Sequence, residues 1–268
     1  MAAHDERTAF LQEVLPRLGL RARGFRRVQG QVHKRIARRV QALGLDGLEA
    51  YRRHLDAHPE EWGVLDGLCR VTISRFFRDR AVFERLREHE LPRLRDAARG
   101  QGRPLRCWSA GCASGEEPYT LALILRVGLG LPPGSHQIVA SDADEALLAR
   151  ARHGRYESGS LKEIPADLKE RGFRRDGPDF RIREEVAEGI EWRCEDLRRS
   201  MPEGPFDAIL CRNLAFTYFG PELQRSTLAR LGERLAVGGV LVLGAHEALP
   251  EGAGWRRAGT LPIFTPER

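Results

Sequence analysis

The most informative segment of this chain reads Trp108-Ser109-Ala110-Gly111-Cys112-Ala113-Ser114-Gly115-Glu116-Glu117-Pro118-Tyr119. An apolar run over 105–108 leads into its small residues, and an apolar, helix-forming run over 119–127 follows. The pattern predicts a strand that turns through small residues into a helix, where a ligand can approach bare backbone amides at the helix N-terminus. We therefore expect a binding loop at this turn.

Two neighbouring acids, Glu116 and Glu117, are unexpected in a phosphate-binding loop because like charges repel. Acidic capping of the helix, with Pro118 in its first turn, would explain one acid but neither the second acid nor the run of small residues. The spacing also differs from the GxGxxG of dinucleotide-binding turns. We interpret the acids as recognising an ammonium group, which indicates an amino-acid-bearing cofactor, S-adenosylmethionine.

The chain after residue 103 alternates between predicted strands and predicted helices. Strands separated by helices of this length predict βαβ units, and hence an α/β fold with a mostly parallel sheet and helices on both faces. A tail over 255–264 is expected to add one antiparallel edge strand. The predicted strands are 104–110, 137–141, 190–194, 206–211 and 239–244, and the predicted helices are 117–128, 143–152 and 221–236.

Polar residues follow the other predicted strands, whose carboxyl ends face the same crevice as the first loop. Asp142 could accept both ribose hydroxyls of an adenosine ligand, and it lies 31 positions beyond Gly111 rather than the interval of about 20 seen in nicotinamide enzymes. Asp196 with Leu197 could meet an adenine ring, and Asn213 the methionine part. Each of these residues alone could equally be a helix cap or an ordinary turn residue.

The first part of the chain differs in pattern. Apolar residues at helical spacing predict an all-helical domain over 1–68, followed by a sheet domain over 69–268. A polar region over about 155–189, rich in Pro and Gly, breaks the alternation and predicts a small β insertion. Between Arg21 and Leu45 there are eight Lys or Arg and no acid.

The basic helix over about 27–42 is interpreted as a docking surface for an acidic or helical protein, with a merely solvated face as the equal alternative. A nucleic-acid partner is not expected, because Phe25 is the single aromatic residue between Arg21 and Leu45 and offers no stacking platform. Five scattered cysteines without a CxxC pair predict neither disulfides nor a metal site, and favour a reducing cytoplasm. No membrane insertion or secretory signal is expected.

Taken together, these motifs resemble the CheR-type methyltransferases, the bacterial chemoreceptor glutamate methyltransferase family. The resemblance implies a class I methyltransferase sheet behind an all-helical N-terminal domain, a small β-subdomain, and S-adenosylmethionine as methyl donor to glutamate side chains of a chemoreceptor-like protein. The motifs that carry the resemblance are Arg35-Ile36-Ala37-Arg38-Arg39, Phe76-Phe77-Arg78-Asp79, Ser114-Gly115-Glu116-Glu117-Pro118-Tyr119, Ala140-Ser141-Asp142, Cys211-Arg212-Asn213 and Tyr218-Phe219.

The resemblance also implies roles for single residues. Arg78 and Tyr218 stand at the catalytic positions, next to the transferable methyl group and the acceptor. This chain departs from the family pattern at Thr72-Ile73-Ser74, where Asn-x-Thr is usual, at Asp196, where Asn is common, and by one extra residue before Tyr218. The implied cofactor contacts are Thr72, Ser74, Arg78, Gly111, Glu116, Asp142, Asp196, Leu197, Asn213 and Leu214.

Three other functions remain open from the sequence. One is a methyltransferase of the same fold with a different protein or a small molecule as acceptor. Another is a nucleic-acid methyltransferase, which only the basic helix suggests. The last is a non-catalytic module that binds the cofactor or docks a partner.

Overall fold

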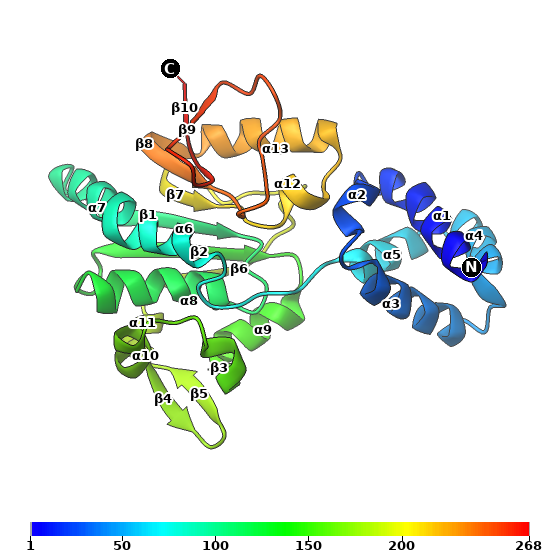
Figure 1. Ribbon diagram of the computed structural model, residues 1–268, viewed down its shortest axis with the longest axis horizontal. Helices are drawn as coiled ribbons and strands as arrows, with labels where there is room; N and C mark the ends of the chain where they lie inside the picture. The colour runs from blue at the N-terminus through cyan, green and yellow to red at the C-terminus, as the bar shows by residue number, and fades with distance from the viewer. Residues whose placement is uncertain (1, 268) are drawn as a thin grey trace. The chain divides into compact units, whose positions relative to one another are not determined.

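The computed structural model describes residues 2–267 and divides into two compact units (Figure 1). The N-terminal unit comprises Met1–Thr72 together with Thr217–Gln224, and the sheet unit comprises Ile73–Phe216 together with Arg225–Arg268. The helices of the N-terminal unit are α1 (Ala2–Arg17), α2 (Ala22–Phe25), α3 (Gln29–Ala42), α4 (Gly47–Ala57) and α5 (Glu61–Cys69).

The N-terminal unit packs around the apolar faces that the helical spacing predicts. Phe10, Ile36, Tyr51 and Leu65 are at most 1% exposed. Burial of four such side chains stabilises the unit by several kcal/mol, at about 1.5–3 kcal/mol each.

The segment Thr217–Gln224 joins the N-terminal unit through backbone hydrogen bonds. Phe219 forms an antiparallel bridge with Leu20. The Arg21 amide donates to the Tyr218 carbonyl at 2.8 Å, and the Gly220 amide donates to the Gly19 carbonyl at 2.8 Å. This unit is therefore built from two stretches that lie far apart in the sequence.

The basic residues of α3 differ in their exposure to solvent. Arg35 donates to the Leu68 carbonyl at 3.3 Å, and Arg39 pairs with the buried Glu61. Lys34 and Arg38 remain exposed on α3. Arg35 and Arg39 are half-buried, because α5 supplies acceptors beside them.

The sheet unit contains a seven-stranded sheet of order β6-β2-β1-β7-β8-β10-β9. Its first five strands pair in parallel, and β10 and β9 are antiparallel. Strand order runs one way from β1 to β2 and the other way from β7 to β8, so right-handed crossovers place helices on opposite faces. The strands are β1 (Leu105–Ala110), β2 (His136–Asp142), β6 (Ile190–Cys194), β7 (Phe206–Leu210), β8 (Leu235–Val242), β9 (Trp255–Arg257) and β10 (Ile263–Pro266).

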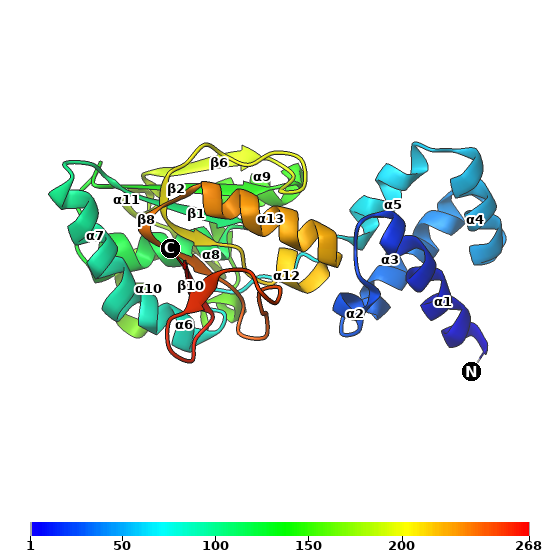
Figure 2. The same ribbon diagram turned by 90° about the horizontal axis from the view of Figure 1, so that it is seen from above.

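Helices α8 and α9 cover one face of this sheet and α13 covers the other, which confirms the predicted α/β class (Figures 1 and 2). The helical elements of this part of the chain are α6 (Arg80–Arg85), the π-turn η1 (Leu86–Glu90), α7 (Leu91–Gly100), α8 (Glu116–Ala122), the π-turn η2 (Leu123–Gly128), α9 (Glu145–His153), the 3-10 turn η3 (Ser158–Leu161), α10 (Ala166–Gly172), α11 (Glu184–Ala187), α12 (Ala215–Tyr218) and α13 (Pro221–Glu233).

Two boundary predictions are wrong. The tail forms two strands rather than one, because a turn at Gly259 (φ +69°) folds it back so that β9 pairs with β10. The helix predicted to reach residue 236 ends at Glu233, and β8 begins at Leu235. Gly238 (φ +77°) lies in an irregularity of β8 rather than at a helix end, so that Phe206 pairs with Leu235 but Ala208 with Val240.

A second, three-stranded antiparallel sheet of order β3-β5-β4 lies within the region of the predicted insertion. The Tyr156 hydroxyl donates to the Ser114 carbonyl at 2.7 Å, so this sheet supports the loop after β1. Over residues 2–267, none of the helices combines the length and apolar character needed to cross a bilayer. The strands are β3 (Arg155–Tyr156), β4 (Phe173–Asp176) and β5 (Asp179–Ile182).

Candidate functional site

The loop between β1 and α8 lies at the point where the strand order reverses. Gly111, Ala113 and Gly115 adopt left-handed φ angles of +80°, +48° and +92°. A Cβ at Gly111 would lie 2.3 Å from Leu214 Cδ2, so the two predicted contact residues Gly111 and Leu214 are neighbours. Open α/β sheets bind ligands at this position, the carboxyl ends of parallel strands where the strand order reverses.

Asp142 ends β2 and holds this loop from the side. Its Oδ2 accepts the Ala113 amide at 2.8 Å, and its Oδ1 accepts the Asp144 amide at 3.0 Å. The cap of α9 is Asp144, whose carboxylate accepts from the amides of Ala146 and Leu147. Asp142 is thus not the helix cap that the sequence left open.

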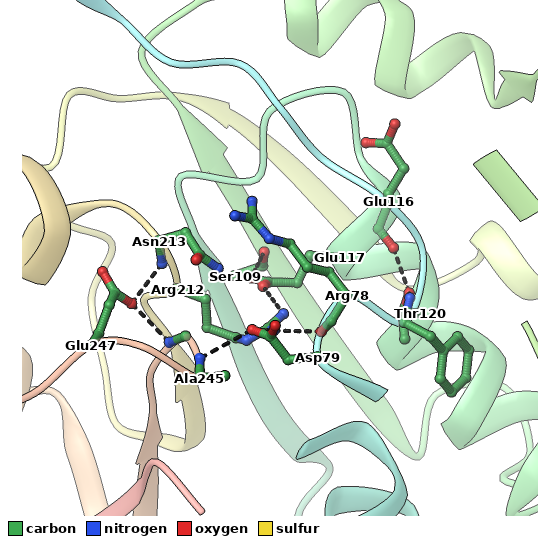
Figure 3. Close-up of polar contacts among 12 residues, drawn as sticks. Arg78, Asp79, Ser109, Glu116, Glu117, Thr120, Arg212, Asn213, Ala245 and Glu247 are labelled. Atoms are coloured by element: carbon green, nitrogen blue, oxygen red, sulfur yellow. Dashed lines mark hydrogen bonds and ion pairs between the residues drawn. The ribbon is translucent and has the colours of Figure 1, made fainter. Parts of the chain in front are cut away.

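The two neighbouring acids have different environments (Figure 3). Glu116 is 5% exposed, and both its carboxylate oxygens accept from the Ser114 hydroxyl, at 3.0 and 2.9 Å. Glu117 points the other way, where it accepts from the Ser109 hydroxyl at 2.7 Å and from Arg212 Nη1 at 3.0 Å. The prediction that both acids face an ammonium group is therefore wrong for Glu117.

Burial raises the pKa of Glu117, while the charge of Arg212 opposes that rise. A paired charge offsets part of the cost of burying a carboxylate, and Arg212 supplies that charge to Glu117. Glu117 is therefore committed to the protein interior, and Glu116 is the acid left to a ligand.

Arg212 stands at the centre of a buried ion-pair cluster that the sequence did not reveal. Its side chain is 2% exposed, and its Nη2 lies 2.8 Å from Asp79 Oδ2. Nη2 also donates to the Arg78 carbonyl, and the guanidinium lies 4.7 Å from the centre of the Phe83 ring. The signal for it was an arginine directly after a fully buried strand.

Arg78 lies on a turn between two left-handed residues, Phe77 (φ +50°) and Asp79 (φ +62°). Its Nη1 donates to the Ile73 carbonyl at 2.9 Å, and the side chain is only partly buried. The predicted contact Ser74 is half-buried in the same stretch.

Asn213 follows Arg212 in a left-handed conformation (φ +56°) that Glu247 holds in place. Glu247 Oε2 accepts the Asn213 amide at 2.6 Å and the Gly244 amide at 2.7 Å. Glu247 is a second residue that the sequence analysis missed, because its partner is a backbone amide distant in sequence.

Asp196 and Leu197 follow β6. Arg198 grips the Asp196 carboxylate with Nε and Nη2, the latter at 2.6 Å from Oδ2. Leu197 is 7% exposed. The Asp196 side chain is thus fixed by its neighbour in the chain.

The sheet unit therefore brings Gly111, Glu116, Asp142, Asn213 and Leu214 to the carboxyl ends of β1, β2 and β7. The predicted residues Thr72 and Tyr218 belong to the N-terminal unit. There the Tyr218 ring packs against Phe25, with 4.9 Å between ring centres.

Residues 72–262 match the family model described as CheR methyltransferase, SAM binding domain. The chain belongs to the CheR methyltransferase family. Among its relatives is the chemotaxis protein methyltransferase of Salmonella typhimurium, 33% identical over 264 residues that cover 90% of this chain and 88% of the relative.

Further relatives extend this comparison. Chemotaxis protein methyltransferase 2 of Pseudomonas aeruginosa is 34% identical over 244 residues, covering 88% of this chain and 84% of the relative. A more distant solved structure is the N-methyltransferase NodS from Bradyrhizobium japonicum in complex with S-adenosyl-L-homocysteine, with 19% identity, a TM-score of 0.33, and coverage of 60% of this chain and 61% of that chain.

The residues of this CheR domain fit S-adenosylmethionine, the cofactor of the family. Over residues 2–267, the Ser114 hydroxyl is the one hydrogen-bond donor to the buried Glu116 carboxylate. A carboxylate has capacity for about four hydrogen bonds, so Glu116 can accept an ammonium group.

Proposed function

We propose that this CheR-family methyltransferase forms methyl esters on glutamate side chains of a chemoreceptor-like protein. The observation that carries the proposal is the similarity to chemotaxis protein methyltransferases along nine-tenths of the chain. The site supports this proposal, because the Arg78 side chain is only partly buried and is a suitable partner for an acceptor carboxylate.

In the proposed reaction the protein binds and orients the two substrates, and no proton transfer is required. A glutamate side chain is already ionised at neutral pH, so no general base is required. When bound, S-adenosylmethionine supplies the methyl group from its sulfonium. Arg78 orients the acceptor carboxylate and Tyr218 fixes the acceptor, which provides alignment and partial exclusion of water.

The proposed cofactor contacts are those that the family resemblance implies, and the environments of some of these residues support them. Glu116 holds the ammonium group, because its carboxylate is buried with hydrogen-bonding capacity left. Asp142 holds the ribose. Gly111 permits close approach of the backbone, and Leu197 offers an apolar surface to the adenine. The remaining proposed contacts are Thr72, Ser74, Asp196, Asn213 and Leu214. Arg78 lies beside the transferable methyl group, where we propose that it contributes little to cofactor affinity.

We also propose a division of labour along the chain. Residues 1–68 form a docking domain, and residues 69–268 form the methyltransferase domain, with a β-subdomain over about 155–189. The exposed side chains of Arg26, Arg27, Lys34 and Arg38 form the basic surface that an acidic helical segment of the substrate contacts. Such a surface speeds association in a salt-dependent way.

Incubation with a radiolabelled methyl donor and receptor-containing membranes tests the proposed chemistry. Label that mild base releases as methanol identifies a carboxyl methyl ester. Arg78→Ala should lower turnover by roughly 10- to 100-fold while the Kd for S-adenosylmethionine changes by less than about threefold. An equal loss of turnover and cofactor affinity would contradict the role given to Arg78.

A second candidate is transfer to a different protein or small-molecule acceptor. The departures from the family pattern at Thr72-Ile73-Ser74 and before Tyr218 favour it, since both stretches are assigned to the site. In the same experiment, label that resists base would support this candidate and exclude the glutamate ester.

A further inference from the structure

We infer that Arg212 is a positioning residue that fixes the turn Phe77–Asp79 and thereby aims Arg78 at the acceptor. The inference rests on the proposed function in one respect, because it takes the role of Arg78 from there. Arg212 itself stands inside the protein and contacts no ligand in this scheme.

The turn that carries Arg78 is strained and requires support. Phe77 and Asp79 both have left-handed φ angles, +50° and +62°. A bulky non-glycine residue adopts this conformation only where its surroundings enforce it. Phe77 is 1% exposed and packs against Phe83, with 5.6 Å between ring centres, so the turn is anchored on one side by apolar contacts.

Arg212 supplies the polar anchor on the other side (Figure 3). One nitrogen, Nη2, donates to the Arg78 carbonyl and lies 2.8 Å from Asp79 Oδ2. The other, Nη1, donates to Glu117 Oε2 at 3.0 Å. The planar guanidinium thus joins the turn to α8, an arrangement that the single ammonium of a lysine does not reproduce.

Helix α8 holds the same turn at a second point. The Thr120 hydroxyl accepts the Phe77 amide at 3.3 Å and donates to the Glu116 carbonyl at 2.6 Å. The Asp79 carboxylate also accepts the Ala245 amide at 3.1 Å. These hydrogen bonds therefore fix the backbone of Arg78 relative to α8, the helix that bears Glu116.

The test compares Arg212→Lys with Arg103→Lys. Arg103 forms a bidentate pair with the buried Asp207 at the other end of β7, with Nη1 and Nη2 at 2.8 and 2.7 Å from the two carboxylate oxygens, and its own side chain is 29% exposed. We expect Arg212→Lys to lower kcat by roughly 10- to 100-fold with the S-adenosylmethionine Kd changed by less than about threefold. Arg103→Lys should leave both within about twofold.

A double-mutant cycle separates positioning from general damage. In the Arg78→Ala background the effect of Arg212→Lys on kcat should shrink to less than about twofold, because its target is gone. An undiminished effect in that background would overturn the inference, as would a normal kcat in Arg212→Lys alone. If Arg212→Lys does not fold, Asp79→Asn replaces it, because Asn tolerates the left-handed conformation, and the same outcomes apply.

Amide hydrogen exchange keeps this inference separate from the proposed reaction. Peptides covering residues 76–80 should exchange faster in Arg212→Lys than in the wild type or Arg103→Lys, whether or not a methyl ester is formed. Unchanged exchange would overturn the inference. Absence of base-labile product from the wild type, with the exchange result as expected, would count against the glutamate reaction alone.

Discussion

Glu116 and Glu117 are adjacent in the sequence but have different surroundings. Consecutive residues of a helix point about 100° apart, so the two carboxylates meet different surroundings. Glu117 accepts hydrogen bonds from Ser109 and Arg212 inside the protein. Among the described residues 2–267, the Ser114 hydroxyl is the one donor to the Glu116 carboxylate. The doubled acid is therefore one structural group, Glu117, and one group that we propose to hold the ligand, Glu116.

Glu116→Gln should weaken S-adenosylmethionine binding, because the amide has no charge with which to hold an ammonium group. We expect Kd to rise roughly 10- to 100-fold, the equivalent of about 1.5–3 kcal/mol for a hydrogen bond to a charged group. Isothermal titration calorimetry measures this directly. Glu145→Gln, an exposed acid of the same unit, serves as the control, and an equal loss of affinity in both variants would refute the assignment.

The sequence motifs placed the loop, Glu116 and Asp142 at the ends of neighbouring strands because strand order follows from the alternation of elements. The partners of Arg212 could not be predicted in this way. Glu117 lies 95 positions and Asp79 133 positions away in the sequence, and no local periodicity links them. The role of Glu247 could not be predicted either, because it binds backbone amides, which carry no sequence signature.

At the scale of helices, Glu61 links three elements of the N-terminal unit. It is 3% exposed and accepts from Arg39 Nε at 3.0 Å, Arg39 Nη2 at 2.7 Å and the Tyr51 hydroxyl at 2.8 Å. The hydrogen bonds from Arg39 lower the pKa of Glu61, although burial opposes the shift. The first residue of α5 is thereby tied to α3 and α4.

Glu61→Gln should reduce the free energy of unfolding by about 2 kcal/mol at neutral pH, because a buried charge-assisted network is broken. A lowered carboxyl pKa gives stability that is complete above the ordinary value of 4.5 and is lost as pH falls through the lowered pKa. The gap between variant and wild type should therefore close below about pH 4.5.

Urea denaturation at several pH values measures this gap. Glu49→Gln removes a carboxylate that is 64% exposed and pairs with Arg52 and Arg53 at the surface. It should cost less than about 0.5 kcal/mol at every pH. A constant gap for Glu61→Gln across the acidic range would show that its charge is not what stabilises the unit.

The existence of most helices and strands followed from apolar periodicity, whereas their ends did not. Helix α3 and strands β1, β2, β6 and β7 lie within a few residues of the predicted ranges. The end of α13 was misplaced because a Gly-Gly pair is typical of a helix end, and here it lies in an irregular strand. Local glycine signals do not distinguish these two uses.

For the whole chain, the notable feature is that the N-terminal unit includes Thr217–Gln224. Gly24 shows how closely the two stretches approach, because a Cβ at that position would lie 2.2 Å from the Thr217 carbonyl oxygen. Backbone at that distance cannot yield without moving Tyr218 as well.

Gly24→Ala should therefore destabilise the protein by roughly 1–3 kcal/mol, as overpacking against fixed backbone does. Gly30→Ala, in α3 with nothing within 4 Å of the added carbon, should instead stabilise it by about 0.5–1 kcal/mol. Thermal melts followed by circular dichroism compare the two variants. A Gly24→Ala protein as stable as Gly30→Ala would show that the close approach imposes no constraint.

Residues Thr217–Gln224 also limit how this protein can be re-engineered. Three peptide links, after residues 72, 216 and 224, connect the two units, so a protease cut after residue 72 leaves Thr217–Gln224 covalently attached to the sheet unit. A chimera that replaces only residues 1–72 with those of a relative would retain Phe219, which pairs with Leu20, and Tyr218, which packs against Phe25. Transfer of the proposed docking domain therefore requires grafting both stretches together.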